Sequence, residues 1–338
     1  MMSSINAYLS SSKMRSRLQV TAFAVLATAL ASAGPVIAQT PSPAPPPGGC
    51  LDPSPEERGF AFVLEDGVFK RADFPGAVLT TFAGINNRGE TAGAYIDATG
   101  IDHGLLSGKR LFLSIDARDA SATVAVKIND RGEILGQYDD NDEVCHGFLL
   151  EGRRLSTIDL PGASYTQPFG INDHGQIVGV FGDVDGTNRG FLLKRGDFRR
   201  IAVPGALATA PADINNRGDI VGFYIDAGGA PRGFLLRAGV FTTIDAPNAS
   251  ATLLLGINNR GQIVGTWRDA AGTGHGLLVE QNNRFSTIDP PGALSNTLAG
   301  DINDRGQIAG VTVDDPRQMP GQTSGSSQRE GSAWPAGK

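Results

Sequence analysis

The most regular polar pattern in the sequence is an aspartate followed six residues later by a basic side chain. The five pairs inside the chain are Asp97 with His103, Asp140 with His146, Asp183 with Arg189, Asp226 with Arg232, and Asp269 with His275. A charged pair that recurs in every repeat cannot easily form a single active site. We therefore predict that the pairs stabilise turns, each by about 0.2–1 kcal/mol. Asp314 and Arg58 would form a sixth pair between the two ends of the fold.

Two of the turns that follow these aspartates are acidic and break the repeat. Oxygen ligands at alternate positions can bind Ca²⁺, so Asp140, Asp142, Asp183 and Asp185 form a weak calcium candidate. Neither turn has the twelve-residue spacing and closing Glu of an EF-hand loop, and a solvated acidic turn is the simpler interpretation. The candidate binding residues, which include two that precede the third repeat, are Asp139, Asp140, Asp142, Glu143, Tyr165, Gln167, Asp183 and Asp185.

The other residues that could do chemistry form no catalytic pattern. The four histidines fall at repeat positions and do not have the spacing of metal ligands. The sequence contains no nucleophile elbow, no phosphate-binding loop and no zinc-protease motif. We predict no catalytic residue and no metal ligand beyond the weak calcium candidate, and we expect no other cofactor.

The two cysteines, Cys50 and Cys145, suggest a disulfide bond. An exported chain matures where disulfides persist. The eight residues from Cys50 to Arg58 can span roughly 25 Å at about 3.3 Å per residue. Our hypothesis is a bridge that ties the N-terminal linker to the fold, and two unrelated thiols are the alternative.

These residues are positioned by an internal repeat. The motif Ile-Asn-(Asn/Asp)-(Arg/His)-Gly begins at Ile85, Ile128, Ile171, Ile214, Ile257 and Ile302, with spacings of 43 residues and a last spacing of 45. Each unit contains four short apolar segments separated by turns rich in Gly, Asn and Asp, which predicts four strands. Four strands in about 40–45 residues are typical of a β-propeller blade.

The two ends of the repeat region predict a closed ring. The last unit stops after Asp314 without its second pair of strands, and residues 58–63 begin the fold with the segment that this unit lacks. We therefore predict an all-β, six-bladed propeller of four-stranded blades, in which the N-terminal strands complete the last blade and no sheet edge is left open. The Ile-Asn strand should be innermost. The Pro-Gly-Ala loops and the five-residue turns should share one face.

Aromatic side chains recur ten residues after the motif isoleucine in five of the six units. They are Tyr95, Tyr138, Phe181, Tyr224 and Trp267. We expect them to pack between blades rather than to form a sugar-stacking platform. Phe60, Phe148, Phe191 and Phe234 are predicted core residues.

The segments outside the repeat predict export. Residues 1–38 contain Lys13, Arg15 and Arg17, then an apolar run and small residues before Gln39, as in a signal peptide. The apolar run of about 14 residues is shorter than the roughly 20 that span a bilayer, so we expect no transmembrane segment after cleavage; an uncleaved anchor is the alternative. Residues 39–57 read as a Pro/Gly-rich linker, 58–315 as the propeller and 316–338 as a disordered tail.

The quoted motifs resemble those of the HAF-type extracellular repeat proteins of bacteria, from Arg58 to about Asp314. The strand 146–150, the loop 156–163 and the hairpin 256–265 carry the resemblance. It implies export and a repeat fold but brings no catalytic residues, because the family has no established activity. Residues 116–120 lack the Pro-Gly step, Asn248 replaces a Gly, and Thr312 replaces the aromatic of the last unit.

Together these features favour a non-catalytic binding or interaction scaffold in the periplasm or outside the cell. The net charge of −6, with Lys and Arg scattered along the chain, argues against a nucleic-acid partner. We expect a monomer that binds a protein or glycan of the cell envelope. The alternative is a secreted propeller hydrolase or lyase that uses acidic loop residues, with calcium as its cofactor.

Overall fold

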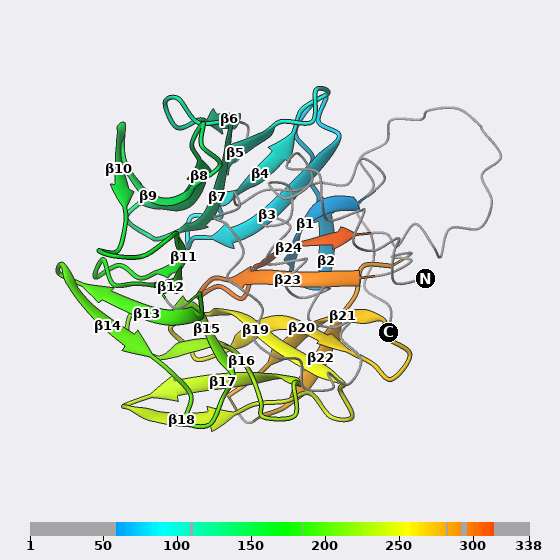
Figure 1. Cartoon of the computed structure of the whole chain (residues 1–338). Helices are drawn as coiled ribbons and strands as arrows, with labels where there is room; N and C mark the ends of the chain where they lie inside the picture. The colour runs from blue at the N-terminus through cyan, green and yellow to red at the C-terminus, as the bar shows by residue number, and fades with distance from the viewer. Residues whose placement is uncertain (1–58, 109–110, 185, 282, 292–295, 314–338) are drawn as a thin grey trace, which may run out of the picture.

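The chain folds into six four-stranded antiparallel sheets arranged as blades around a central axis (Figure 1). The computed structural model describes residues 59–108, 111–184, 186–281, 283–291 and 296–313. The predicted six-bladed β-propeller is confirmed. The predicted signal peptide, linker and tail lie outside the described residues. No helix long and apolar enough to cross a membrane occurs in the described ranges.

Each blade is a meander whose first strand is innermost. Blade 1 contains β3 (Leu79–Ile85), β4 (Thr91–Ile96), β5 (Asp102–Gly108) and β6 (Leu111–Ile115). Blade 2 contains β7 (Ala122–Ile128), β8 (Ile134–Asp139), β9 (Cys145–Glu151) and β10 (Arg154–Ile158). Blade 3 contains β11 (Thr166–Ile171), β12 (Ile177–Gly182), β13 (Asn188–Lys194) and β14 (Asp197–Ile201).

The remaining blades repeat this order, but blade 6 combines the two ends of the described chain. Blade 4 contains β15 (Ala208–Ile214), β16 (Ile220–Ile225), β17 (Pro231–Arg237) and β18 (Val240–Thr243). Blade 5 contains β19 (Ala251–Ile257), β20 (Ile263–Arg268), β21 (Gly274–Val279) and β22 (Phe285–Ile288). Blade 6 contains β23 (Asn296–Ile302), β24 (Ile308–Val313), β1 (Gly59–Glu65) and β2 (Val68–Arg71), in the sheet order β2-β1-β24-β23.

The register of β1 differs from the sequence prediction by two residues. Phe62 pairs with Gly310, as Phe148 pairs with Gly136 in blade 2. Phe62 therefore occupies the core position that we assigned to Phe60, and Phe60 takes the place that His146 holds in blade 2. Phe62 is fully buried, whereas Phe60 is half-buried with the guanidinium of Arg71 4.8 Å above its ring.

The Ile-Asn motif forms the turn between the first and second strands because its Asn side chain replaces a backbone partner. In blade 1, Asn86 Oδ1 accepts hydrogen bonds from the backbone N–H groups of Arg88 and Glu90. Gly89 follows with φ +76°, a conformation that costs glycine little. The same bonds recur in the other five blades, so the motif forms an Asx turn in every blade.

The core lies between adjacent blades, and each third strand contributes one large buried side chain to it, which is Phe in blades 2, 3, 4 and 6 and Leu in blades 1 and 5. Phe148, Phe191 and Phe234 are at most 1% exposed, as predicted. In blades 1 to 5, a threonine near the start of the inner strand fixes the preceding loop: Thr166 Oγ1, for example, accepts the backbone N–H of Leu160 at 3.0 Å. The result is a rigid disc in which each blade is pinned to the one before it.

The antiparallel order gives the disc two different faces. Loops between blades lie on the same face as the turns between second and third strands, and we call this the crossover face. Turns between first and second strands lie on the opposite face, which we call the asparagine face. Both assignments agree with the sequence prediction that the Pro-Gly-Ala loops and the five-residue turns share one face.

Candidate functional site

The five predicted Asp–basic pairs are present on the crossover face of blades 1 to 5. Distances between the paired N and Oδ2 atoms lie between 2.5 and 3.5 Å. In each turn whose bonds are described, the other carboxylate oxygen accepts backbone N–H groups; Asp140 Oδ1, for example, accepts those of Asp142 and Val144, both at 2.9 Å. The pairs therefore hold turns together, as predicted.

Four of these five basic side chains also contact a second aspartate that the sequence analysis missed. Asp159 reaches His146 Nδ1 at 3.0 Å, while Asp140 reaches its Nε2 at 3.2 Å. The equivalent second aspartates are Asp116, Asp245 and Asp289, and blade 3 has Ala202 instead. The recurring Ile-Asp step before the Pro-Gly loop was the signal that could have revealed them. We call these groups the outer clamps.

The outer clamps shift the titration of their histidines. Burial alone lowers the pKa of His146, but its bonds to Asp159 and Asp140 outweigh burial and raise the pKa above its ordinary value. The pKa values of His103 and His275 are raised in the same way. The protonated histidine is therefore favoured in the folded protein.

The sequence analysis also predicted a sixth pair, in blade 6. Asp314 and Arg58 both lie outside the described residues, but Phe60 stands where the other blades have His or Arg. Thr312, opposite Phe60, replaces the aromatic of the other blades. Blade 6 therefore carries its aromatic ring on the third strand instead of the second, and Phe60 takes the position of the clamp's basic side chain.

The recurring aromatics pack between blades, as predicted, because each one contacts a core cluster that includes residues of the preceding blade. Tyr95 stacks on Phe74 of the preceding loop, with ring centroids 3.8 Å apart, and on His103 at 4.9 Å. Tyr138 and Trp267 stack on the histidines of their own blades. These rings position the outer clamps and do not form an open platform.

The acidic turn of blade 2 presents exposed carboxylates. Asp142 and Glu143 are exposed at its tip, whereas the Asp140 carboxylate is engaged by its own turn and by His146. In blade 3, Asp183 bonds Val184 N and Arg189, and Asp185 lies outside the described residues. The described residues contain no group of three or more His, Cys, Asp or Glu placed to hold a metal ion. Calcium binding stays a prediction.

The other candidate binding residues lie at the junction of blades 2 and 3. Asp139 and Gln167 are buried, so they do not contribute exposed surface. Tyr165 is half-buried, and its hydroxyl donates to Asn188 Oδ1 at 2.5 Å; burial raises its pKa to about 12.

Cys145 is buried on β9, with Gln167 Nε2 3.8 Å from its Sγ. Cys50 lies outside the described residues, so their pairing stays a prediction. Two free thiols in the mass spectrum of the mature protein would contradict it.

The asparagine face carries a polar site that sequence reasoning did not find. The first Asn of each motif donates from Nδ2 to the backbone oxygen of the same residue in the next blade: Asn86 to Asn129, Asn129 to Asn172, and on around to Asn303, which returns to Asn86. These six bonds of 2.9–3.3 Å form a closed circle of buried amides. Each blade is thus fastened to both neighbours at its inner end.

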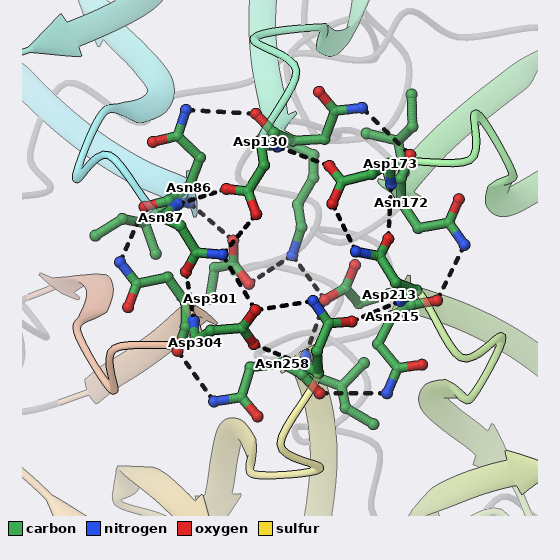
Figure 2. Close-up of a pocket in the computed structure, with 18 of the residues that line it drawn as sticks. Asn86, Asn87, Asp130, Asn172, Asp173, Asp213, Asn215, Asn258, Asp301 and Asp304 are labelled. Carbon is green, nitrogen blue, oxygen red and sulfur yellow. Dashed lines mark hydrogen bonds and ion pairs between the residues drawn. The ribbon is translucent and has the colours of Figure 1, made fainter.

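A second circle lies on the residue that follows. Each backbone N–H donates to the Oδ1 atom of the equivalent side chain one blade on, at 2.6–2.9 Å. Its six members, which we call the rim, are Asn87, Asp130, Asp173, Asn216, Asn259 and Asp304. Figure 2 shows the Asp130, Asp173 and Asp304 carboxylates pointing toward the axis. The rim surrounds a recess of about 400 Å³, including the part of its mouth that is open to solvent.

Three charged residues lie below the rim and meet across the axis. Lys127 Nζ lies 2.7 Å from Asp213 Oδ2 and 2.5 Å from Asp301 Oδ1, and all three side chains are at most 9% exposed. Asp213 Oδ2 and Asp301 Oδ2 each accept a backbone N–H of a neighbouring blade, from Ile257 and Ile85. We call this group the axial triad; it joins blades 2, 4 and 6.

Glycine occupies the triad position in blades 1, 3 and 5. A Cβ at Gly170 would stand 2.6 Å from the Cα of Asp213, and one at Gly84 or Gly256 would stand 2.8 Å from the next blade's charged residue. Each charged residue therefore needs a glycine in the blade before it. The alternation of Gly with Lys or Asp before the motif isoleucine is a signal already present in the sequence.

The triad contains two carboxylates and one ammonium away from water. Burial raises the pKa of Asp301 to about 6, despite the opposing attraction of Lys127, and it raises the pKa of Asp213 as well. Burial lowers the pKa of Lys127, but attraction to Asp213 and Asp301 outweighs it, so the pKa is raised. The lysine therefore keeps its charge, and both carboxylates are easier to protonate than an exposed aspartate.

Comparison with known proteins supports the fold and no more. No family model matches the sequence, and no curated protein does. Among solved structures, the chain is similar to a putative TolB from Agrobacterium tumefaciens, with a TM-score of 0.55, 13% identity, and coverage of 77% of this chain and 99% of that one. It is also similar to TolB from Acinetobacter baumannii, with a TM-score of 0.51, 12% identity, and coverage of 76% and 65%.

Proposed function

We propose that this protein is a non-catalytic propeller that acts as a binding or interaction scaffold in the cell envelope or outside the cell. The observation that carries the proposal is on the crossover face, where the turns between second and third strands share one frame but differ at their tips. A fixed scaffold that presents variable loops on one face is typical of binding proteins.

The shared frame is the hydrogen-bonded aspartate of each turn. Asp97, Asp140 and Asp226 each accept the backbone N–H groups two and four residues later. Because these bonds use the aspartate at the base of the turn, the residues beyond it can vary without loss of the turn.

The tips differ in chemistry from blade to blade. Ile101 in blade 1 is 44% exposed and Val184 in blade 3 is 86% exposed, whereas blade 2 presents Asp142 and Glu143. The loop before β15 adds Leu207 at 69% exposure. A face with separate apolar and acidic points suits an envelope protein or a glycan as partner better than a nucleic acid.

Export and monomeric action are part of the proposal. Residues 1–38 have the composition of a signal peptide, which supports a location in the periplasm or outside the cell. A ring in which each blade already has two neighbours needs no second chain to complete it.

The test is site-specific photo-crosslinking in cells that express the protein naturally. A photoreactive amino acid at position 142 on the crossover face is expected to capture a discrete partner. The same amino acid at position 153, in an exposed turn of the asparagine face, is the matched control and is expected not to capture it. Capture from position 153 alone would contradict the assigned face. Turnover of a secreted polymer that Asp142→Asn abolishes would contradict the non-catalytic role.

A further inference from the structure

The recess on the asparagine face concentrates negative charge. Five aspartates and one lysine line it, which gives a net formal charge of −4. Three of these carboxylates belong to the rim and two to the axial triad. A recess with low-dielectric walls and one sign of excess charge focuses its field on an incoming counter-ion.

One carboxylate oxygen inside the recess has no hydrogen-bond partner among the described residues. Asp213 Oδ2 is bonded to Lys127 and to Ile257 N, whereas Asp213 Oδ1 is buried and has no well-formed hydrogen bond; the N–H of the adjacent Ile214 also approaches the carboxylate. Figure 2 shows the Asp213 carboxyl group within the circle of the rim. An unmet buried acceptor is unfavourable by about 1–3 kcal/mol, so a donor that enters the recess would be stabilised there.

The carboxylates are better placed for an organic cation than for a metal ion. Rim carboxylates accept hydrogen bonds from their neighbours; Asp173 Oδ2, for instance, accepts from Asn216 Nδ2 at 2.6 Å. They lie around an opening instead of converging on one point. Lys127 shows which group suits this chemistry, since its ammonium already bonds two carboxylates of the triad.

Basic residues around the opening of the recess limit which groups a bound organic cation can carry. The fourth motif residue is basic in every blade and exposed: Arg88, Arg131, His174, Arg217, Arg260 and Arg305. Three of these arginines pair with acidic residues in their own turns, at 2.7–3.2 Å. A ligand with several positive charges would meet this basic collar, whereas one with a neutral or anionic far end would not be repelled.

We propose that the recess binds a single primary ammonium group on a short alkyl chain whose other end is neutral or anionic. An ω-amino acid and a lysine side chain both have this chemistry. The ammonium would enter along the axis, face Asp130, Asp173 and Asp304, and donate toward Asp213. This site is separate from the proposed partner surface, because the two occupy opposite faces of the disc.

The first experiment is isothermal titration calorimetry of the full chain with 6-aminohexanoate. We expect saturable binding that weakens as salt is added. Hexanoate lacks the cation and 6-(trimethylammonio)hexanoate lacks the N–H donors; both are expected to bind at least tenfold more weakly. Equal binding of either control, or no binding of 6-aminohexanoate, would overturn the proposal.

The second experiment places the site by mutation. Asp130→Asn and Asp173→Asn should leave the fold intact, because Asn already occupies this position in blades 1, 4 and 5. Each is expected to weaken binding about tenfold, equivalent to about 1.4 kcal/mol. Asp197→Asn makes the same chemical change at an exposed site on β14 and is expected to leave binding unchanged. Unchanged affinity in the Asp130/Asp173 double variant, with an unchanged melting temperature, would place binding elsewhere and refute the site.

A third arm distinguishes the two sources of the ammonium. A blocked tripeptide with a central lysine that binds as tightly as 6-aminohexanoate would identify the lysine side chain of a partner as the occupant. Binding of 6-aminohexanoate alone would identify a small free amino acid. Loss of photo-crosslinking at position 142 would leave all three results untouched, so the two proposals fail independently.

Discussion

The axial triad and the outer clamps use the same residue types in opposite ways. The triad occurs once, is buried, and contains one residue from each of three blades. The clamps occur in four blades, and the fifth pair, in blade 3, lacks only the second aspartate; the basic side chains of all five are 21–35% exposed. Charge at the circumference is therefore a property of the repeat, whereas charge at the axis is a property of the whole ring.

The difference matters because burial changes what an ion pair contributes. A partly exposed pair is screened by water and can be lost at small cost. Removing one member of a buried group leaves an uncompensated charge in a low-dielectric interior. Variants at the axis should therefore have large effects and variants at the circumference small ones, and the following predictions test that ranking.

Lys127→Met is expected to have the largest effect. It leaves the carboxylates of Asp213 and Asp301 buried without their cation, which should lower the free energy of unfolding by about 3–5 kcal/mol. Equilibrium denaturation near neutral pH measures this. Lys70→Met, which removes an exposed pair with Glu65, is the control and should cost about 1 kcal/mol or less. Equal losses in both variants would show that axis and circumference do not differ.

Asn172→Ala should have an intermediate effect. Its side chain accepts two backbone N–H groups of its own turn and donates to the backbone oxygen of Asn215, so the change opens one link of the inner circle. We expect a loss of about 1–3 kcal/mol, again by equilibrium denaturation. Asn141→Ala, at an exposed turn position, should be nearly neutral. If the two variants were indistinguishable, the circle would contribute nothing beyond local turns.

The fold was predictable from the sequence because the motif period of 43 residues fixes both the number of blades and the face of each turn. The register of β1 was not, because Arg58-Gly59-Phe60 imitates the basic-Gly-aromatic step, whereas burial selects Phe62 for the core.

The candidate site was harder to predict than the fold. The pairing of Asp140 with His146 could be inferred because they flank one turn, but Asp159 reaches His146 from another strand. Lys127, Asp213 and Asp301 looked like variation at one strand position, since only ring closure brings residues of three blades to one point. Local residue spacing was therefore enough to predict the Asp–basic pairs of the outer clamps but not the axial triad.

The histidine clamps should make stability depend on pH. The folded pKa values of His103, His146 and His275 are raised. Their stabilisation is therefore fully present below about pH 6.5 and is lost as the pH rises through the folded values. Replacing all three with Arg should flatten the fall in melting temperature above about pH 6.5. If the melting temperature of the variant fell with pH as steeply as that of the wild type, protonation of the clamp histidines would not contribute to stability.

A second fall in melting temperature, at lower pH, should remain in the variant with three arginines. The pKa of Asp301 is raised to about 6, so stability declines as the pH rises from the unfolded value toward this one. Because Asp301 and the clamp histidines titrate in different pH ranges, one pH series of melting temperatures separates the contribution of the axial triad from that of the outer clamps.

The converse change should have the smallest effect. Arg232→His converts an arginine clamp into a histidine clamp between Asp226 and Asp245. We expect a small loss of stability that appears only above about pH 6.5, because the new imidazole is then neutral. Melting curves at two pH values are sufficient, and an equal loss at both would mean that arginine geometry, and not charge, matters in blade 4.

The glycines between the triad residues have a consequence for how such a ring can grow. Because each charged axial residue needs a glycine in the preceding blade, the smallest unit that fits on both sides is two blades and not one. Duplication of a single blade would set two bulky residues, or two glycines, next to each other, and the first arrangement collides at the backbone. A ring of this kind is therefore expected to change size in even steps, so that four or eight blades are more accessible to it than five or seven.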